Sequence, residues 1–144
     1  PREMMLRRCA MRPVWLFSLD TEQFSSVPMT TGRLKAYFHT YGRTPDRTQV
    51  DLVHFLQADE IEPWLRKSWD AQELGRAKAA LAEGITPVAG FSIYTWNAEH
   101  FLAAIKHLRA SCPELLIVVG GPHVQRAADF LFGDGIDVVV LGEG

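Results

Sequence analysis

Two short runs near the end of the chain are apolar at almost every position. Leu115–Val119 reads Leu-Leu-Ile-Val-Val, and Ile136–Leu141 reads Ile-Asp-Val-Val-Val-Leu. A strand with one wet face alternates apolar and polar residues, whereas a continuous apolar run is typical of a strand covered on both faces. The two runs therefore predict neighbouring central strands of a parallel sheet.

Three further runs rich in β-branched and aromatic residues predict strands at Val14–Leu19, Gln49–Phe55 and Val88–Tyr94. Helical patterns separate the five runs. They cover residues 30–42, 70–84, 97–112 and 124–132.

The helical patterns carry apolar stripes and boundary signals. One helix face is predicted from the spacing of Leu34, Tyr37, Phe38 and Tyr41, with Thr30 or Thr31 as the cap. In the second pattern Asp70 and Glu73 form a capping box, which predicts a helix start there. In the third, Asn97 stands in the cap position before a stripe of four residues. These are Phe101, Ala104, Ile105 and Leu108.

Strands that alternate with helices in this way predict a parallel sheet with right-handed crossovers. The expected fold class is α/β, a doubly wound, flavodoxin-like or Rossmann-like sheet of five parallel strands with helices on both faces. We expect residues 1–144 to form a single domain with residues 1–12 as an extension. Because the chain starts at Pro1 and ends directly after an apolar strand, we also expect it to be a piece of a longer polypeptide.

Charge and cysteine content exclude several functions. The chain has 15 basic and 17 acidic residues and a formal net charge of −2, which disfavours binding to nucleic acid. No apolar run is long enough to span a membrane, so we expect a cytoplasmic protein. With only Cys9 and Cys112, the chain alone can build neither a disulfide framework nor a cysteine-held iron–sulfur cluster.

Ligands of doubly wound sheets bind beyond the carboxyl ends of the strands, where the strand order reverses. The first such loop, Asp20–Ser25, contains no glycine, which disfavours NAD, FAD and a P-loop. A phosphoacceptor receiver domain would use the acid at Asp20. However, the third strand leads into Thr95-Trp-Asn and the fifth into Gly-Glu-Gly, neither of which fits that class.

Three segments point to a different ligand. They read Val88-Ala-Gly-Phe-Ser-Ile-Tyr-Thr-Trp-Asn97, Val119-Gly-Gly-Pro-His123 and Ile136-Asp-Val-Val-Val-Leu-Gly-Glu-Gly144. In this order they closely resemble the cobalamin-binding domain at the N-terminus of cobalamin-dependent radical SAM enzymes. That family has a strand reading GFSvyiWN, a later GGP, and a strand that ends in GEGE. The resemblance is strong over residues 88–144 and is one of pattern only before them.

A second similarity is to B12 proteins in general, whose pattern is D-x-H-x-x-G, then S-x-L, then a Gly-Gly pair. Ser92-Ile-Tyr94 stands for S-x-L, and the spacing of residues 93–119 before Gly120 fits the pattern. The first loop departs from it, because Asp20-Thr-Glu-Gln-Phe-Ser25 lacks the histidine that ligates cobalt from below. That departure is typical of the radical SAM branch.

The resemblance implies a set of cofactor-binding residues. Gly120 and Gly121 would leave a slot for the nucleotide tail, although the pair alone could be just a tight turn. The Ser92 hydroxyl would bond the tail, Tyr94 and Asn97 would meet the tail or corrin amides, and Asn97 could equally be a helix cap. Backbone or side-chain contacts are expected from Asp20, Pro122, His123, Gly142, Glu143 and Gly144.

The lower face of cobalt would then be covered by a residue that does not coordinate it. Candidates lie in the segment after the second strand, where Trp64, Arg66 or Trp69 could shield the metal from water. The alternative is that both tryptophans hold this segment to the core. We expect Trp96 to pack rather than to contact a ligand.

By resemblance, the chain binds cobalamin, as methylcobalamin or hydroxocobalamin, with the base and histidine off the metal. The parent enzyme would be a methylcobalamin-dependent C-methyltransferase, often of natural-product biosynthesis, whose radical SAM domain in the same polypeptide holds a [4Fe–4S] cluster and S-adenosylmethionine. The chain itself would have no catalytic residues. The alternatives are a corrinoid-carrier module of another B12 enzyme and a flavodoxin-like or receiver-like interaction domain without cofactor.

Overall fold

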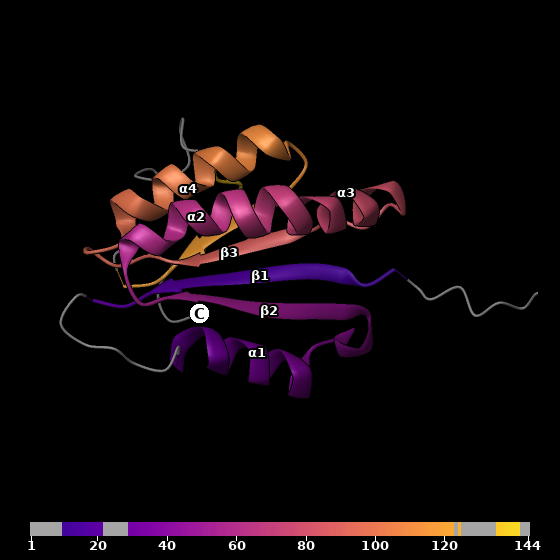
Figure 1. The fold of residues 1–144 in the computed structure, drawn as a ribbon. Helices are drawn as coiled ribbons and strands as arrows, with labels where there is room; N and C mark the ends of the chain where they lie inside the picture. The colour runs from indigo at the N-terminus through magenta and orange to yellow at the C-terminus, as the bar shows by residue number, and fades with distance from the viewer. Residues whose placement is uncertain (1–9, 22–28, 123, 125–134, 142–144) are drawn as a thin grey trace, which may run out of the picture.

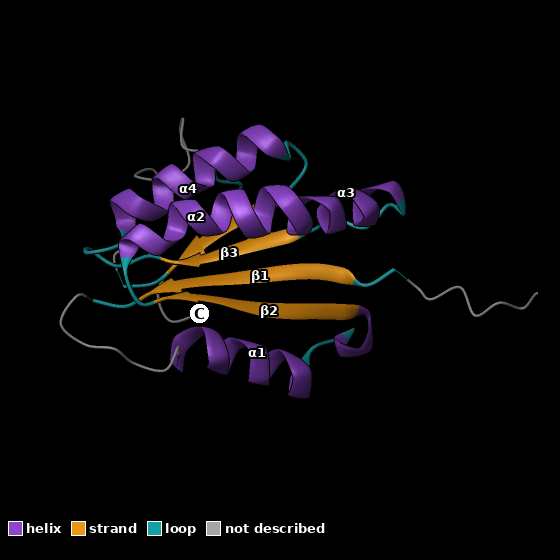
Figure 2. Ribbon diagram, viewed as in Figure 1, coloured by secondary structure: helices purple, strands orange, loops and turns teal. Residues whose placement is uncertain are grey.

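A computed structural model describes residues 10–21, 29–122, 124 and 135–141. Within this part five strands form one parallel sheet in the order β2-β1-β3-β4-β5, which lies as a single layer between helices (Figure 2). The strands are β1 Arg12–Leu19, β2 Thr48–Phe55, β3 Val88–Ser92, β4 Leu116–Gly120 and β5 Val138–Val139. The predicted α/β fold class and the five parallel strands are confirmed.

The helices of the described part cover both faces of the sheet. Helix α1, Met29–Tyr41, lies on one face, and α2, α3 and α4 lie on the other (Figure 1). Those three span Ile61–Trp64, Leu74–Ala82 and Ala98–Ser111. Shorter helical elements are η1 Pro45–Arg47, η2 Ala58–Glu60 and η3 Leu65–Glu73. The predicted helix at residues 124–132 falls almost wholly outside the described residues.

The core lies between the sheet and the helices α2, α3 and α4. Along β1, alternate residues point into it, so that Trp15 and Phe17 are 1% exposed. The aromatic ring of Phe17 stacks on that of Phe91 in β3, with ring centroids 4.4 Å apart. From α4, the predicted stripe of Phe101, Ala104, Ile105 and Leu108 is buried against them, as expected.

The prediction of a helix start at Asp70 is wrong. The chain is helical without a break from Ile61 through the π-helical η3 to the end of α3, and Asp70 lies inside η3. Buried Ile61, Leu65 and Trp69 recur every four residues and place one apolar stripe on the sheet, which stabilises a continuous helix. The Asp70 side chain instead contacts the Nε2 atom of His107 at 2.8 Å.

Helix α1 forms where its stripe predicts it, but that stripe is largely exposed. Leu34 is 44% exposed, Tyr37 67% and Tyr41 70%, and the two tyrosine rings contact each other. The buried residue of α1 is Thr31. The spacing of the apolar residues therefore predicts the position of this helix but not the side that packs against the sheet.

The sheet order defines where a ligand of this fold would bind. Because β1 is flanked by β2 on one side and β3 on the other, the order reverses between β1 and β3. Their register brings Phe17 beside Phe91, so the carboxyl ends of both strands lie at the same edge. A ligand of this fold class would therefore bind at that edge.

Candidate functional site

The loop between β3 and α4 is held closed by the Asn97 side chain. Asn97 Oδ1 accepts a hydrogen bond from the Tyr94 backbone N–H at 2.8 Å, and Asn97 Nδ2 donates to the Ser92 carbonyl at 3.0 Å. Asn97 is at the N-cap position of α4 as predicted, but its side chain bonds the loop and not the helix. With 0% exposure, Asn97 is a positioning residue for Ser92 and Tyr94.

Two buried hydroxyl groups flank the reversal point. Ser92 Oγ, at the end of β3, and Thr21 Oγ1, just after β1, have no hydrogen-bond partner among the residues that the structure describes. A buried hydroxyl left unsatisfied costs about 1–3 kcal/mol, and folded proteins normally satisfy such groups. A polar ligand that bonds both hydroxyls would remove this cost.

The glycine pair after β4 has two different roles. A side chain at Gly121 would place its Cβ 2.6 Å from the Ile93 carbonyl oxygen, and its φ of +113° is one that other residues rarely adopt. The fold itself therefore requires Gly121. At Gly120, the nearest atom to an added Cβ would be Val140 Cβ at 3.5 Å, an ordinary contact. Packing among the described residues therefore does not require glycine at position 120.

Asp20 begins the loop that follows β1 and is held by β2. Its backbone N–H donates to the Phe55 carbonyl at 3.0 Å, and its carboxylate Oδ2 lies 3.5 Å from His54 Nε2. The other ring nitrogen of His54 is 2.7 Å from Ser18 Oγ. In this chain Asp20 is therefore paired with a strand histidine and not with a histidine of its own loop.

Tyr94 and Trp96 form a stacked aromatic pair at the carboxyl end of β3. Their ring centroids are 4.4 Å apart and their planes differ by 23°. The Trp96 indole N–H donates to the carbonyl of Leu19, the last residue of β1, at 3.3 Å. Trp96 therefore packs against Tyr94 and bonds the end of β1, as expected, although 46% of its surface stays exposed.

The two tryptophans of the candidate lower-face shield belong to α2 and η3, on the face of the sheet that carries α2, α3 and α4. Trp69 is 0% exposed, packs edge-on against Trp15 and donates to Ser111 Oγ at 2.8 Å. Of the two alternatives for Trp69, the structure supports packing in the core. Trp64 packs edge-on against Phe17.

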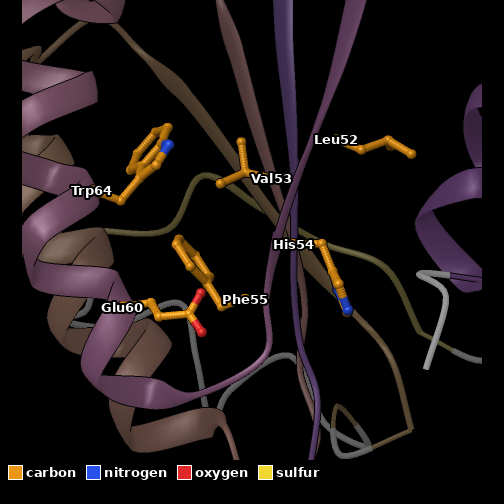
Figure 3. A pocket seen from close by; sticks show the side chains of 6 residues that line it. All are labelled: Leu52, Val53, His54, Phe55, Glu60 and Trp64. Atoms are coloured by element: carbon orange, nitrogen blue, oxygen red, sulfur yellow. The ribbon is translucent and has the colours of Figure 1, made fainter. Parts of the chain in front are cut away.

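Trp64 also lines a cavity of about 270 Å³ beside β2. In Figure 3 the side chains of Trp64, Val53 and Phe55 lie on the side of β2 that faces α2, while those of Leu52 and His54 point to the opposite side. This cavity follows the outer edge of the sheet. It is not at the reversal point, and none of the residues predicted from the three motifs lines it.

The structure thus brings seven of the predicted site residues to one edge. They are Asp20, Ser92, Tyr94, Asn97, Gly120, Gly121 and Pro122. The predicted contacts of His123, Gly142, Glu143 and Gly144 lie outside the described residues. Sequence reasoning missed Thr21, for which the available signal was a hydroxyl residue directly after a strand.

Two general properties of the described part bear on the class of site. No described helix has both the length and the apolar composition needed to cross a membrane. Among the same residues, no three His, Cys, Asp or Glu side chains come together as a metal site would require.

Comparison with known proteins defines the class. Residues 76–144 match the family model of the B12 binding domain. The second half of this chain is therefore similar to B12-binding domains, as the motifs between Val88 and Gly144 predict.

A particular relative is a 2-(S-pantetheinyl)-carbapenam-3-carboxylate methyltransferase from Streptantibioticus cattleyicolor. It is 31% identical over an alignment of 126 residues that covers 83% of this chain. The aligned region is 18% of that protein, so the chain spans less than a fifth of the relative's length.

Proposed function

We propose that this chain binds cobalamin at the carboxyl ends of β1, β3 and β4, with the nucleotide tail inserted beside Ser92 and Gly120. The observation that carries the proposal is the pair of buried hydroxyls of Ser92 and Thr21 at the reversal point, for which the described part of the chain offers no partner. A base, ribose or phosphate offers partners for both hydroxyls. The missing side chain of Gly120 leaves room for such a tail to approach the backbone.

The residues of this edge divide into those that would touch the cofactor and those that position them. Ser92, Thr21, Tyr94 and Gly120 would hold the cofactor, and Asn97 fixes the loop that carries Ser92 and Tyr94. Bound cobalamin supplies a cobalt centre that can carry a methyl group. The loop from Asp20 to Thr31 contains no histidine, which supports binding with the base and histidine off the metal.

We propose further that the parent protein is a cytoplasmic, cobalamin-dependent radical SAM methyltransferase. Support comes from the order of the GFS, Trp-Asn, GGP and GEG motifs and from the relative, which is a methyltransferase. In such a protein residues 1–144 would form one cobalamin-binding domain. The [4Fe–4S] cluster and S-adenosylmethionine would belong to a partner domain of the same polypeptide.

Uptake of hydroxocobalamin by the purified chain tests the binding proposal. We expect the corrinoid to co-elute with the chain on gel filtration and its absorption bands to shift. In Gly120→Val the added methyl groups would fill the tail slot, so we expect at least a tenfold weaker complex with an unchanged circular dichroism spectrum.

Gly75→Val is the matched control, because an added Cβ at Gly75 meets no atom within 4 Å. This variant should bind as the unaltered chain does. If Gly120→Val bound hydroxocobalamin as tightly as Gly75→Val, the slot would not be at Gly120. If the unaltered chain bound none, the function proposed here would be wrong.

A further inference from the structure

The Tyr94–Trp96 pair is held from three sides at the edge where β1 and β3 diverge. Stacking joins the two rings, the Trp96 indole N–H bonds the end of β1, and the Tyr94 hydroxyl lies 3.4 Å from Thr30 Oγ1 in the first turn of α1. The pair therefore connects β1, β3 and α1 across the reversal point. An aromatic residue fixed by this many contacts is not a loosely placed surface side chain.

Despite these contacts, 46% of the Trp96 surface remains exposed. The other tryptophans are different, because Trp15 is 1% and Trp69 0% exposed and Trp64 is partly buried against Phe17. Burial of a large aromatic surface is strongly favourable, so a rigid, half-exposed indole beside a ligand site is suited to contact a flat, apolar partner. Ser92 and Thr21, in contrast, are buried and polar and suit the hydrogen-bonding tail.

We propose that Trp96, backed by Tyr94, is the platform against which the corrin macrocycle lies, while Ser92 and Gly120 serve the tail. The inference rests on the proposed cobalamin function and adds a division of the edge into a ring subsite and a tail subsite. Contacts to the ring would then be independent of contacts to the tail. This independence can be measured, because cobinamide has the corrin ring but lacks the nucleotide tail.

Protection of Trp96 from oxidation tests the proposal on the unaltered chain. N-bromosuccinimide oxidises accessible indoles, and mass mapping of peptides locates the product. Without ligand we expect Trp96 to react ahead of Trp15, Trp64 and Trp69, following their exposure. Hydroxocobalamin and dicyanocobinamide at saturating concentration should each slow the oxidation of Trp96 by at least threefold.

Variants give the second arm of the test. Trp96→Ala should weaken both cobalamin and cobinamide by a similar factor of about 3- to 10-fold, and Trp96→Phe, which keeps a ring, by less. Gly120→Val should weaken cobalamin and leave cobinamide unchanged. Tyr41→Ala is the control, because Tyr41 also belongs to an exposed aromatic pair but lies at the other end of α1.

The outcomes separate the two proposals. If the chain binds cobalamin but Trp96 stays unprotected, or if Trp96→Ala weakens cobalamin and not cobinamide, the platform is wrong and the binding function stands. If the chain binds neither corrinoid, both proposals fail. Should Trp96→Ala lose its circular dichroism signal, Trp96→Phe and the oxidation of the unaltered chain still decide the question.

Discussion

At the scale of single residues, the hydroxyl of Ser92 opposes stability and favours binding. A buried hydroxyl without a partner lowers the stability of the protein, and an alanine there would keep the packing and remove the unsatisfied group. The same hydroxyl is placed at the reversal point, where a ligand could bond it. Removal of the Ser92 hydroxyl should therefore raise the stability of the cobalamin-free chain and lower its affinity for cobalamin.

For Ser92→Ala we expect the free energy of unfolding of the cobalamin-free chain to rise by about 1–2 kcal/mol. The dissociation constant for hydroxocobalamin should rise by about 5- to 10-fold, because one hydrogen bond to the tail is lost. Urea denaturation and an absorption titration measure the two quantities.

Ser18→Ala is the contrasting variant, because the Ser18 hydroxyl already has a partner in His54. Its removal should lower the free energy of unfolding by about 1 kcal/mol. A Ser92→Ala chain that gained stability but kept its affinity would show Ser92 to be a core residue and nothing more.

The motifs could predict Ser92 and the glycine pair, because these residues belong to the sequence pattern of the family. They could not separate the two glycines, since only the backbone of Ile93 shows why Gly121 is required and Gly120 is not. Nor could they predict the bond from the Trp96 indole to the Leu19 carbonyl, because the two residues are far apart in the sequence.

At the scale of elements, the helical segment Ile61–Ala82 shows two local signals in conflict. The Asp70-x-x-Glu73 pattern predicts a helix start, whereas the spacing of Ile61, Leu65 and Trp69 favours one long helix. The stripe prevails because it buries apolar surface on the sheet, and a capping box contributes less than the burial of one tryptophan. Strand boundaries were predicted to within a few residues, because their apolar runs are unambiguous.

Trp69 is the anchor of this segment, and its replacement tests the packing role. Trp69→Phe keeps an aromatic ring against Trp15 and loses the bond to Ser111. We expect the free energy of unfolding to fall by about 1–3 kcal/mol and the affinity for hydroxocobalamin to stay within twofold. Thermal denaturation and the absorption titration provide both values. Unchanged stability with weakened corrinoid binding would instead favour the shield role.

At the scale of the whole molecule, the strand order β2-β1-β3-β4-β5 is what gathers the site. It brings the loops after β1, β3 and β4 to one edge, although Thr21 and Gly120 are far apart in the sequence. The alternation of strands and helices could predict the parallel sheet. The sequence patterns did not predict the order of the strands, so only the structure identifies which loops become neighbours.

Hydrogen–deuterium exchange with and without hydroxocobalamin tests the central claim most directly. We expect the corrinoid to slow amide exchange in peptides that cover residues 92–98 and 118–122, and to leave the cavity strand around Leu52–Phe55 unchanged. Protection confined to Leu52–Phe55, or absent from all these peptides under conditions of saturation, would contradict a cobalamin site at the carboxyl ends of β1, β3 and β4.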